Sequence, residues 1–286
     1  MAEKLRISYL GPEGSYTHQT ALNLFEKKAD LVPSSTITNT VHDLASGLVD
    51  KAVVPIENSI AGGVAETIEA IQREENIYVT NEYILPISHC LLGSDSVVED
   101  LSQVKKLRSH HMSLGQCMDF IAKKLPNAEI VPSSSNSAAA KDLRKRIDAK
   151  EDTSDHVVIA SKLCAEIYGL KVIDESINDA SINETRFWIL SKEIAEYNPA
   201  AKNKTTILLQ TKDEPGSLQV VLRLFAVNNV NLSRIESRPA KKNIGEYLFL
   251  IDIDLHRDDN KYEDLIRQMK QHLTYYKWLG SYSLID

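Results

Sequence analysis

The segment Asn81–Gly93, which reads NEYILPISHCLLG, decides how the rest of this chain is organised. It is an extended, largely apolar stretch interrupted by Pro86, and it lies between two runs in which strand-like and helix-like segments alternate. A second such connection, Glu175–Thr185, follows the second run. We therefore expect two lobes joined by two crossings, with Asn81–Gly93 as the first crossing and Glu175–Thr185 as the second. A cleft between two lobes is a common place for a small-molecule site.

Strand-like and helix-like segments alternate on both sides of the first crossing. In the first run we expect strands at Leu5–Leu10 and Lys51–Pro55 and helices at Thr17–Phe25, Val41–Val49 and Val64–Arg73. In the second run we expect strands at Lys105–Arg108, Glu129–Val131 and Val157–Ala160, and helices that start near Met112, Ser137 and Lys162. This alternation is typical of parallel sheets flanked by helices.

The C-terminal part of the chain follows a different order of elements. After a linker at Glu196–Asn203 we expect strands at Thr205–Gln210, Leu232–Arg238, Glu246–Asp254 and Tyr276–Leu284, with helices at Ser217–Asn228 and Tyr262–Leu273. The turn Ala240–Asn243 supports the central hairpin. The resulting βαββαβ order is ferredoxin-like, and that fold alone fixes no function.

The composition restricts the class of protein. The chain has 286 residues, a hydrophobic content of 43% and a formal net charge of −7, which predicts a globular protein and argues against a nucleic-acid partner. No apolar run is long enough for a membrane span, so we expect a soluble, cytoplasmic protein without a membrane partner. The spacing of Cys90, Cys117 and Cys164 fits no zinc or redox motif, which predicts buried, reduced thiols without a disulfide or a metal.

Polar residues gather where strands are expected to end, and open α/β sheets bind ligands at such positions. Thr185 and Arg186 enter the apolar strand Phe187–Leu190, and Glu57–Ser59 follows another buried strand. Each motif also has a structural explanation as the cap of a turn or helix. Gly11–Thr17 opens a helix but lacks P-loop and dinucleotide spacing, which argues against ATP and NAD.

The stretch Ser109–His111 ends another expected strand. Adjacent side chains in an extended segment point to opposite faces, which argues against both a serine-hydrolase and a metal site there. Ser135–Ser137 is a good cap for the following helix, and its amides and hydroxyls could equally meet a carboxylate.

In order and spacing, these motifs resemble those of prephenate dehydratases. The stretches that carry the resemblance are Gly11–Tyr16, Pro55–Ser59, Ser109–His110, Gln116–Cys117, Ser135–Ala139 and Thr185–Phe187. Pro215–Leu218 and Glu236–Pro239 are similar to the two phenylalanine-binding motifs of the family's ACT regulatory domain. His111, Asn136 and Ser217 depart from the proline, threonine and alanine that are common in the family at these positions.

The resemblance implies an α/β fold with a two-lobed, periplasmic-binding-protein-like catalytic domain, followed by an α+β ferredoxin-like ACT domain. The catalytic domain would span residues 1–198, with lobe 1 at about 1–85 plus 180–198 and lobe 2 at about 86–179, and the ACT domain residues 203–286. No chorismate mutase segment precedes residue 1, so we expect the monofunctional form.

By the same resemblance, the protein would be a lyase that converts prephenate to phenylpyruvate in phenylalanine biosynthesis, without a cofactor. The implied catalytic residues are Thr185, Glu57, Asn58, Ser109 and Gln116, and the implied substrate-binding residues are Ser15, Tyr16, Ser59, His110, Asn136, Ser137, Arg186 and Phe187. Thr185 would lie at the leaving hydroxyl and donate a hydrogen bond to it, in a relay that includes Glu57.

Regulation is implied by the same resemblance. The effector L-phenylalanine would bind at Gly216, Ser217, Leu218, Glu236, Ser237 and Arg238, across a subunit interface of a homodimer or homotetramer. Two alternatives remain open at this point: an arogenate dehydratase, and a non-enzymatic two-lobed amino-acid sensor with an ACT domain.

Overall fold

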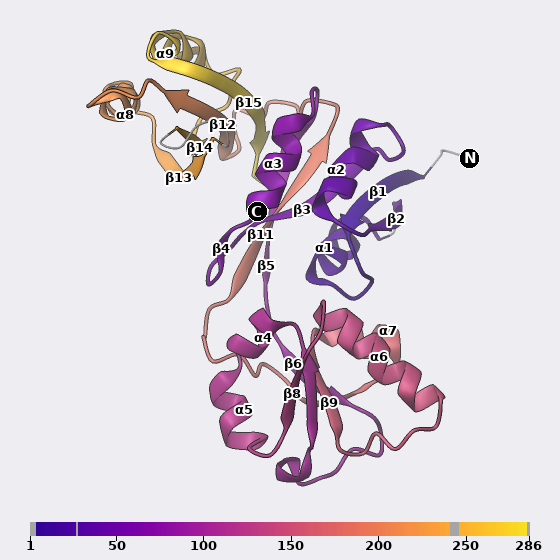
Figure 1. Cartoon of the computed structure of the whole chain (residues 1–286). Helices are drawn as coiled ribbons and strands as arrows, with labels where there is room; N and C mark the ends of the chain where they lie inside the picture. Colours follow the sequence, from indigo (N-terminus) through magenta and orange to yellow (C-terminus); the bar gives the residue numbers. More distant parts are fainter. Residues whose placement is uncertain (1–3, 27, 241–245, 285–286) are drawn as a thin grey trace. The chain divides into compact units, whose positions relative to one another are not determined.

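The computed structural model describes residues 4–26, 28–240 and 246–284. These residues form two compact units, of which the first holds the chain up to Ala70 together with Ile84–Phe187 (Figure 1). The second unit holds Ile71–Tyr83 and the chain from Trp188 onward. The turn predicted at Ala240–Asn243 lies, beyond Ala240, outside the described residues.

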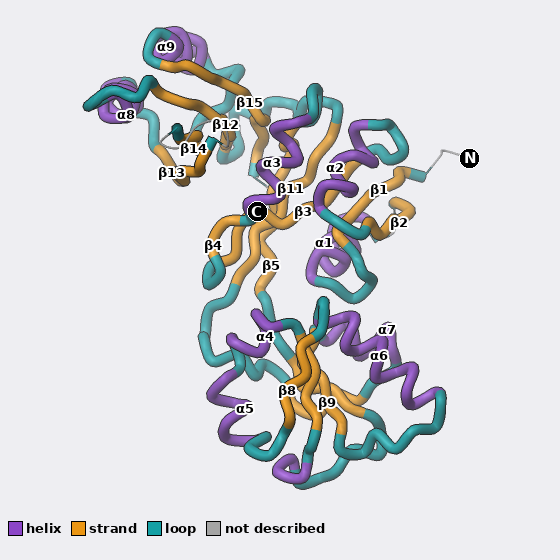
Figure 2. Tube along the Cα trace, in the orientation of Figure 1, coloured by secondary structure: helices purple, strands orange, loops and turns teal. Residues whose placement is uncertain are grey.

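The first sheet has the strand order β2-β1-β3-β11-β5, with the short β4 paired to β3. Its elements are β1 Leu5–Leu10, α1 Tyr16–Phe25, β2 Ala29–Ser34, α2 Ile37–Ala45, β3 Lys51–Asn58, β4 Gly62–Gly63, α3 Ala65–Arg73, β5 Tyr78–Pro86 and β11 Glu184–Ser191. Strand β1 runs parallel to both β2 and β3. Because β11 returns between β3 and β5, the end of β3 lies beside the start of a strand far along the sequence (Figure 2).

The second sheet has the strand order β10-β6-β9-β7-β8. Its elements are β6 Cys90–Gly93, the 3₁₀ turn Leu101–Gln103, β7 Lys106–Ser109, α4 His111–Gly115, α5 Met118–Lys124, β8 Glu129–Pro132, α6 Asn136–Asp148, β9 His156–Ala160, α7 Lys162–Tyr168 and β10 Lys171–Asp174. Helices α6 and α7 lie on one side of this sheet and α4 and α5 on the other (Figure 1). Val158 and Ala160 pack toward the first pair, Val157 and Ile159 toward the second, so β9 is apolar on both faces.

The expectation of parallel sheets was wrong for the second sheet. Strand β7 is parallel to β8 and β9, but β6 runs antiparallel to both β9 and β10. The reason is the two crossings: the chain enters this sheet through β6 and leaves it through β10, so these neighbouring strands must run in opposite directions. Both sheets are therefore part of a two-lobed α/β arrangement, as expected, but the second one is mixed.

Several element boundaries also differ from the prediction. Helix α2 begins at Ile37, well before Val41, because the Thr36 hydroxyl accepts from the Asn39 amide and caps it, and it ends at Ala45. Strands β2 and β10 were not predicted: both lie at sheet edges, where strands are less apolar, and β2 contains Pro33. Strand β3 extends past Pro55 through Asn58, so Glu57 and Asn58 belong to the strand.

The third sheet confirms the predicted ferredoxin-like order. Its strands are arranged β13-β14-β12-β15, and each neighbouring pair is antiparallel. The elements are β12 Asn203–Thr211, α8 Ser217–Val227, β13 Leu232–Pro239, β14 Tyr247–Ile253, α9 Asn260–Lys270 and β15 Leu273–Ser283. Helix α9 ends before Leu273, which was predicted as helical and instead starts β15.

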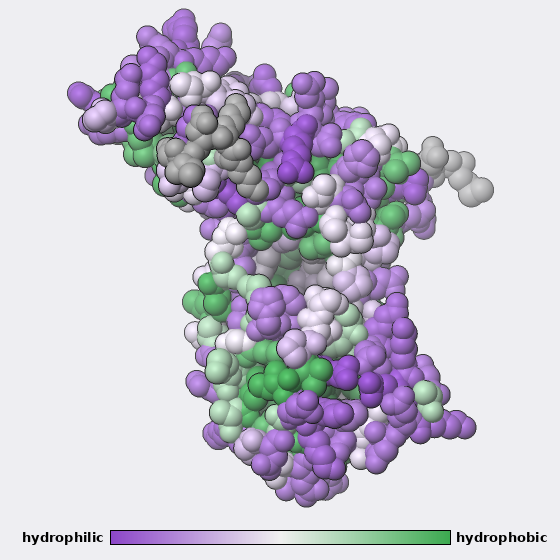
Figure 3. Space-filling model, viewed as in Figure 1, coloured by the Kyte–Doolittle hydropathy of each residue, from purple (hydrophilic) through white to green (hydrophobic). Residues whose placement is uncertain are grey.

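The cysteines, the lengths of the apolar helices and the distribution of apolar surface can now be compared with the sequence. Cys90, Cys117 and Cys164 are buried, free thiols, as expected. Within the described residues, no helix is long and apolar enough to cross a membrane. Apolar surface gathers over α5 and β8 (Figure 3), where Met118 is 64% and Ile130 49% exposed.

Candidate active site

Asn58 and Thr185 meet where β3 ends and β11 begins. The Asn58 Nδ2 atom lies 3.0 Å from Thr185 Oγ1. The backbone amides of Ile60 and Ala61 donate to Asn58 Oδ1 at 3.0 and 2.8 Å, which fixes the orientation of the side-chain amide. Asn58 is therefore the donor to Thr185, and because a hydroxyl has one hydrogen and two lone pairs, Thr185 keeps its own hydrogen for another acceptor.

Glu57 and Arg186 form the neighbouring pair on the same two strands. Arg186 Nη2 lies 3.2 Å from Glu57 Oε2, with the arginine side chain 11% exposed and the glutamate 41%. Successive side chains of a strand alternate between faces, so this pair and the Asn58–Thr185 pair are directed to opposite faces. The sequence had suggested a relay from Glu57 to Thr185, whereas the structure places Glu57 against Arg186 and Asn58 against Thr185.

A row of hydrogen bonds connects Thr185 to helix α1. Asn58 Nδ2 also donates to Asn183 Oδ1 at 2.9 Å, and Asn183 Nδ2 donates to Gln116 Oε1 at 3.0 Å. His89 Nε2 lies 2.9 Å from the same Gln116 oxygen, and the Tyr16 hydroxyl lies 2.8 Å from His89 Nδ1. We call these six residues the polar network: Tyr16, His89, Gln116, Asn183, Asn58 and Thr185.

Two members of the polar network, His89 and Asn183, were not predicted. His89 is 2% and Asn183 5% exposed, and they lie on the first and second crossing respectively. Burial lowers the pKa of His89, against a smaller opposing effect of its hydrogen bond to Gln116, and burial raises the pKa of Tyr16 well above its ordinary value. The signal available in the sequence was a polar residue inside each crossing, but only the fold shows that both side chains are buried and that both contact Gln116.

The loop Gly11–Ser15 lies against the N-terminal ends of α6 and α7. The Glu13 carbonyl accepts from the Ser137 hydroxyl and from Tyr168 at 3.0 Å. The Gly14 carbonyl accepts from Ser161 at 3.0 Å and from Cys164 Sγ at 3.2 Å. Gly14 has φ +83°, and a Cβ there would lie 2.8 Å from Cys164 Sγ, so the position requires glycine.

Ser15 and Ser137, both predicted to bind substrate, hold the backbone of this region. The Ser15 hydroxyl accepts from the His18 amide at 3.1 Å and donates to the Leu10 carbonyl at 3.0 Å. Ser137 is 1% exposed, and its hydroxyl donates to the Glu13 carbonyl. Ser15 therefore fixes the loop at the start of α1, and Ser137 joins the loop to helix α6.

Ser109, His110 and Asn136 form a second polar cluster at the end of β7. The Ser109 hydroxyl, which is fully buried, lies within donating distance of Asn136 Oδ1 at 2.9 Å and of the Ile159 carbonyl at 2.7 Å. Asn136 Oδ1 also accepts from the His110 amide at 3.1 Å, and its Nδ2 donates to Ser113 at 2.8 Å. The cluster thus joins the end of β7 to the start of α6.

The two histidines after β7 lie closer together than the extended geometry implied. Helix α4 begins at His111, so the chain turns between the residues and brings the ring centroids of His110 and His111 to 4.2 Å. Burial, with a smaller contribution from His111, lowers the pKa of His110. Among the described residues, no group of three or more acidic, histidine or cysteine side chains could hold a metal ion.

Ser59 and Phe187 complete the predicted substrate-binding set. Ser59 is exposed; its hydroxyl accepts from the Glu184 amide at 3.0 Å and its amide donates to the Glu184 carbonyl at 2.9 Å. Phe187 is 1% exposed and belongs to the hydrophobic core. Ser59 therefore fastens β3 to the start of β11, while Phe187 anchors the strand that carries Thr185.

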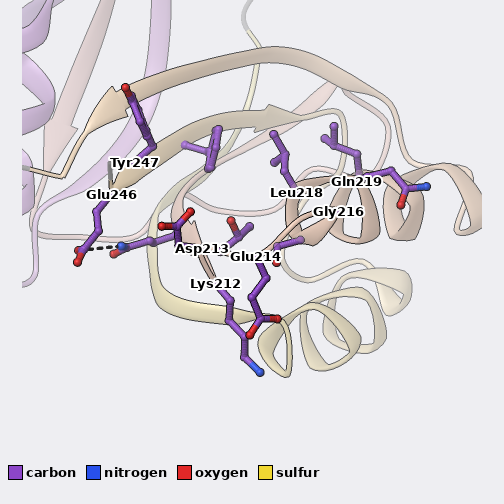
Figure 4. A pocket seen from close by; sticks show the side chains of 13 residues that line it. Lys212, Asp213, Glu214, Gly216, Leu218, Gln219, Glu246 and Tyr247 are labelled. Atoms are coloured by element: carbon purple, nitrogen blue, oxygen red, sulfur yellow. Dashed lines mark hydrogen bonds between the residues drawn. The ribbon is translucent and has the colours of Figure 1, made fainter. Parts of the chain in front are cut away.

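A second candidate site lies at the start of α8. A cavity of about 490 Å³ is lined by Gly216, Ser217 and Leu218, together with residues of β12 and β14 and the loop between β12 and α8 (Figure 4). Gly216 adopts φ +86° and immediately precedes the helix, so the first amides of α8 face this region. The cavity contains three of the six predicted effector residues.

The other three predicted effector residues lie on β13. Glu236 is paired there with Arg234 at 2.5 Å and with Arg238 at 3.8 Å, and alternation places these three side chains on one face of the strand. Ser237 is exposed on the opposite face. In the described part of the chain, none of the three lines the cavity at α8.

The comparisons with known proteins agree with this fold. Residues 7–195 match the family model for prephenate dehydratase. The chain is 34% identical over 285 residues to the prephenate dehydratase of Methanocaldococcus jannaschii, covering 98% of both chains. It is also 34% identical over 283 residues to the bifunctional chorismate mutase/prephenate dehydratase of Aquifex aeolicus, covering 99% of this chain and 74% of that protein.

A solved structure supports the same assignment over both units. It is the prephenate dehydratase from Arthrobacter aurescens in complex with L-phenylalanine, with 33% identity, a TM-score of 0.86 and coverage of 98% of this chain and 90% of that one. With the family model matched over most of the length and relatives above 30% identity along nearly all of it, this chain belongs to the prephenate dehydratase family.

Proposed function

We propose that this protein converts prephenate to phenylpyruvate, carbon dioxide and water. The observation that carries the proposal is the Asn58–Thr185 hydrogen bond, which leaves the threonine hydroxyl able to donate. In the reaction, the bond between the ring and its carboxylate breaks, and its electron pair enters the ring. The carbon–oxygen bond of the ring hydroxyl breaks at the other end, and the oxygen leaves as water after taking up one proton. Aromatisation supplies the driving force.

Thr185 is placed in this scheme as the donor to the departing hydroxyl. A neutral threonine is a weak acid, so its role is a hydrogen bond that strengthens as negative charge develops on the oxygen. Asn58 orients this donor, because its amide occupies a lone pair of the threonine oxygen. Gln116 accepts two hydrogen bonds at its oxygen, so its NH₂ group is the part directed elsewhere and can contact substrate.

Arg186 and Glu57 are assigned to the charge of the substrate. Prephenate carries two carboxylates, and the Arg186 guanidinium belongs to a side chain that is 11% exposed and offers five donors. Glu57 is the ion-pair partner of Arg186 and would orient the guanidinium group so that its remaining donors receive a carboxylate. Ser59, His110 and Asn136 would shape the remaining contacts, with Ser15, Ser109, Ser137 and Phe187 acting through the backbone that they hold.

The proposal is tested by incubating the purified protein with prephenate and following phenylpyruvate. Arogenate, which carries an amino group where prephenate has a keto group, is assayed in parallel and separates the two dehydratase activities. A non-enzymatic sensor would bind prephenate or arogenate without converting either compound. Absence of phenylpyruvate at any substrate concentration would rule out the proposed reaction.

We further propose that L-phenylalanine is the effector and binds at the start of α8. The solved relative from Arthrobacter aurescens holds L-phenylalanine, and the cavity at Gly216–Leu218 combines the N-terminal end of a helix, which favours a carboxylate, with apolar side chains for a ring. Glu236, Ser237 and Arg238 would complete the site from a neighbouring subunit of a homodimer or homotetramer. In this assignment residues 1–198 are catalytic and residues 203–286 regulatory.

The regulatory proposal requires a test of its own. Calorimetry with L-phenylalanine, combined with light scattering, measures binding and the oligomeric state in one sample. We expect binding by wild type and a strong loss in Gly216→Val, because valine at φ +86° distorts the loop that presents the amides. Unchanged binding in that variant would place the effector elsewhere.

A further inference from the structure

His89 and Asn183 have no role in the reaction as described so far, yet they connect the residues that do. Both are buried polar side chains, and each bridges two other members of the polar network. A buried polar group is costly unless its hydrogen bonds are satisfied, and a complete network specifies one arrangement. The direction of each hydrogen bond can be followed from a fixed starting point.

The starting point is Asn58, whose oxygen is occupied by two backbone amides. Its NH₂ group is therefore the donor toward Asn183 Oδ1, the Glu184 carbonyl and Thr185 Oγ1, at 2.9, 3.0 and 3.0 Å. With its oxygen occupied, Asn183 can offer only its NH₂ group to Gln116, whose oxygen accepts. Each amide in this part of the network is thereby held in one of its two orientations.

The same reasoning fixes the tautomer of His89. Gln116 Oε1 is an acceptor, so the His89 nitrogen at 2.9 Å, Nε2, must carry the proton. In the neutral imidazole Nδ1 is then an acceptor, and the Tyr16 hydroxyl, which lies 2.8 Å from this nitrogen and 2.8 Å from the Ser88 carbonyl, shares its one hydrogen between the two acceptors. The His89 backbone amide donates to Asn178 Oδ1 at 2.7 Å, which holds the residue itself in place.

We propose that His89 and Asn183 are positioning residues of the active site, which together hold the Gln116 side-chain amide in one orientation, with its NH₂ group left for the substrate, and connect it to Asn58, the donor to Thr185. This inference rests on the proposed dehydratase activity. Both crossings would then contribute a residue that positions the active site, because His89 lies on the first crossing and Asn183 on the second. If the link from Asn183 to Gln116 is broken, the Gln116 amide can turn and present its oxygen instead of its NH₂ group to the substrate.

The test variant is Asn183→Asp, which has nearly the same shape. At neutral pH an ionised carboxylate still accepts from Asn58 but cannot donate to Gln116, so one link is broken. We expect kcat to fall about 10- to 100-fold with little change in KM, as for a slight misplacement of a catalytic group. A protonated carboxyl can both accept and donate, so the deficit relative to wild type should shrink as the pH is lowered toward about 5, since burial raises a carboxyl pKa.

The control is Asn178→Asp, the same chemical change on the same crossing but outside the polar network. It keeps the acceptor for the His89 amide and loses only the longer, 3.3 Å hydrogen bond from Nδ2 to the Ile87 carbonyl, so we expect a nearly normal rate with the wild-type pH profile. Other titratable groups near the network are shared by both variants. They are Tyr16, His89, Cys90, Cys117, Asp179, Glu184, Glu57 and Arg186.

A measurement on wild type tests the hydrogen-bond direction without relying on activity. Nitrogen-15 NMR of the imidazole should show His89 protonated at Nε2 and unprotonated at Nδ1 near neutral pH. A proton on Nδ1 would overturn the assigned direction, even if Asn183→Asp failed to fold. If wild type forms phenylpyruvate but Asn183→Asp has the wild-type rate and pH profile, the positioning role is wrong. If wild type forms none, the proposed function itself is wrong, while the NMR result still decides the tautomer.

Discussion

Gly280 of β15 lies against the backbone of Val79 so closely that no side chain fits between them. A Cβ at Gly280 would lie 2.1 Å from the Val79 carbonyl oxygen and 2.7 Å from its amide nitrogen. Both residues belong to the second compact unit, in which Ile71–Tyr83 accompanies the C-terminal sheet. Backbone atoms cannot move aside as a flexible side chain can, so this contact requires glycine.

Gly280→Ala should therefore destabilise the second unit. Overpacking usually costs about 1–3 kcal/mol, and we expect the upper end of that range because the clash is with backbone. Urea unfolding followed by circular dichroism measures the change. Gly115→Ala is the matched control, since a Cβ there meets nothing within 4 Å, and it should unfold near the wild-type midpoint. Equal midpoints for the two variants would contradict the packing argument.

Lys277 makes a second contact within the same unit. Its ammonium donates to the carbonyls of Ile71, Gln72 and Glu74 at 2.9, 3.1 and 2.7 Å, at the C-terminal end of α3. The last carbonyls of a helix have no partner within the helix, and a cation there also complements the helix dipole. Burial lowers the pKa of Lys277, partly offset by Glu75 and Glu74.

Lys277→Met keeps the apolar stem and removes the donor. Leaving buried carbonyls without a partner costs about 1–3 kcal/mol, so the free energy of unfolding should fall by that amount. Lys202→Met, at an exposed lysine of the same unit, is the control and should have little effect. Unfolding of the Lys277 variant at the wild-type midpoint would show that water replaces the lysine without cost.

Helices and the strands at the centre of a sheet were predicted better from the sequence than edge strands, and better than the order in which the strands lie side by side. Strand β9 was recognised because both of its faces are buried, and the start of α6 because Ser135 is a strong cap. Strands β2 and β10 were missed because edge strands lack a continuous apolar run. The motifs of Asn58 and Thr185 were visible, but their contact depends on β11 entering the sheet beside β3, and no local pattern encodes that order of strands.

The polar network shows the same limit at the level of side chains. Gln116 and Tyr16 were predicted to contact substrate, while the residues that join them, His89 and Asn183, were not. A histidine or an asparagine in a crossing is ordinary for a surface connection. Only the packing of both crossings against α1 and α4 makes these residues buried, and burial makes their hydrogen bonds obligatory.

Burial of His89 predicts a dependence of stability on pH. The pKa of His89 is lowered in the folded protein, so below its ordinary value near 6.5 the unfolded chain binds a proton that the folded protein does not. Stability is fully present above pH 6.5 and decreases as the pH falls toward the lowered value, by at most about 1.4 kcal/mol per pH unit for this group. His89→Gln should unfold with a shallower acid dependence than wild type. Parallel slopes between pH 7 and 5 would show that His89 titrates normally.

Thr185 is the residue on which the proposed reaction depends most directly. Thr185→Ala removes the hydroxyl but leaves Asn58 held by Ile60 and Ala61, so the fold should persist while kcat falls about 10²- to 10³-fold, the usual loss for one preorganised donor. Thr185→Ser keeps the donor without the methyl group that restricts its rotation, so it should retain part of the activity. Steady-state rates on prephenate compare the three proteins, with unfolding midpoints measured alongside. Full activity in the alanine variant would remove Thr185 from the mechanism, whereas a rate that recovers in serine identifies the hydroxyl itself as the group that acts on the departing oxygen.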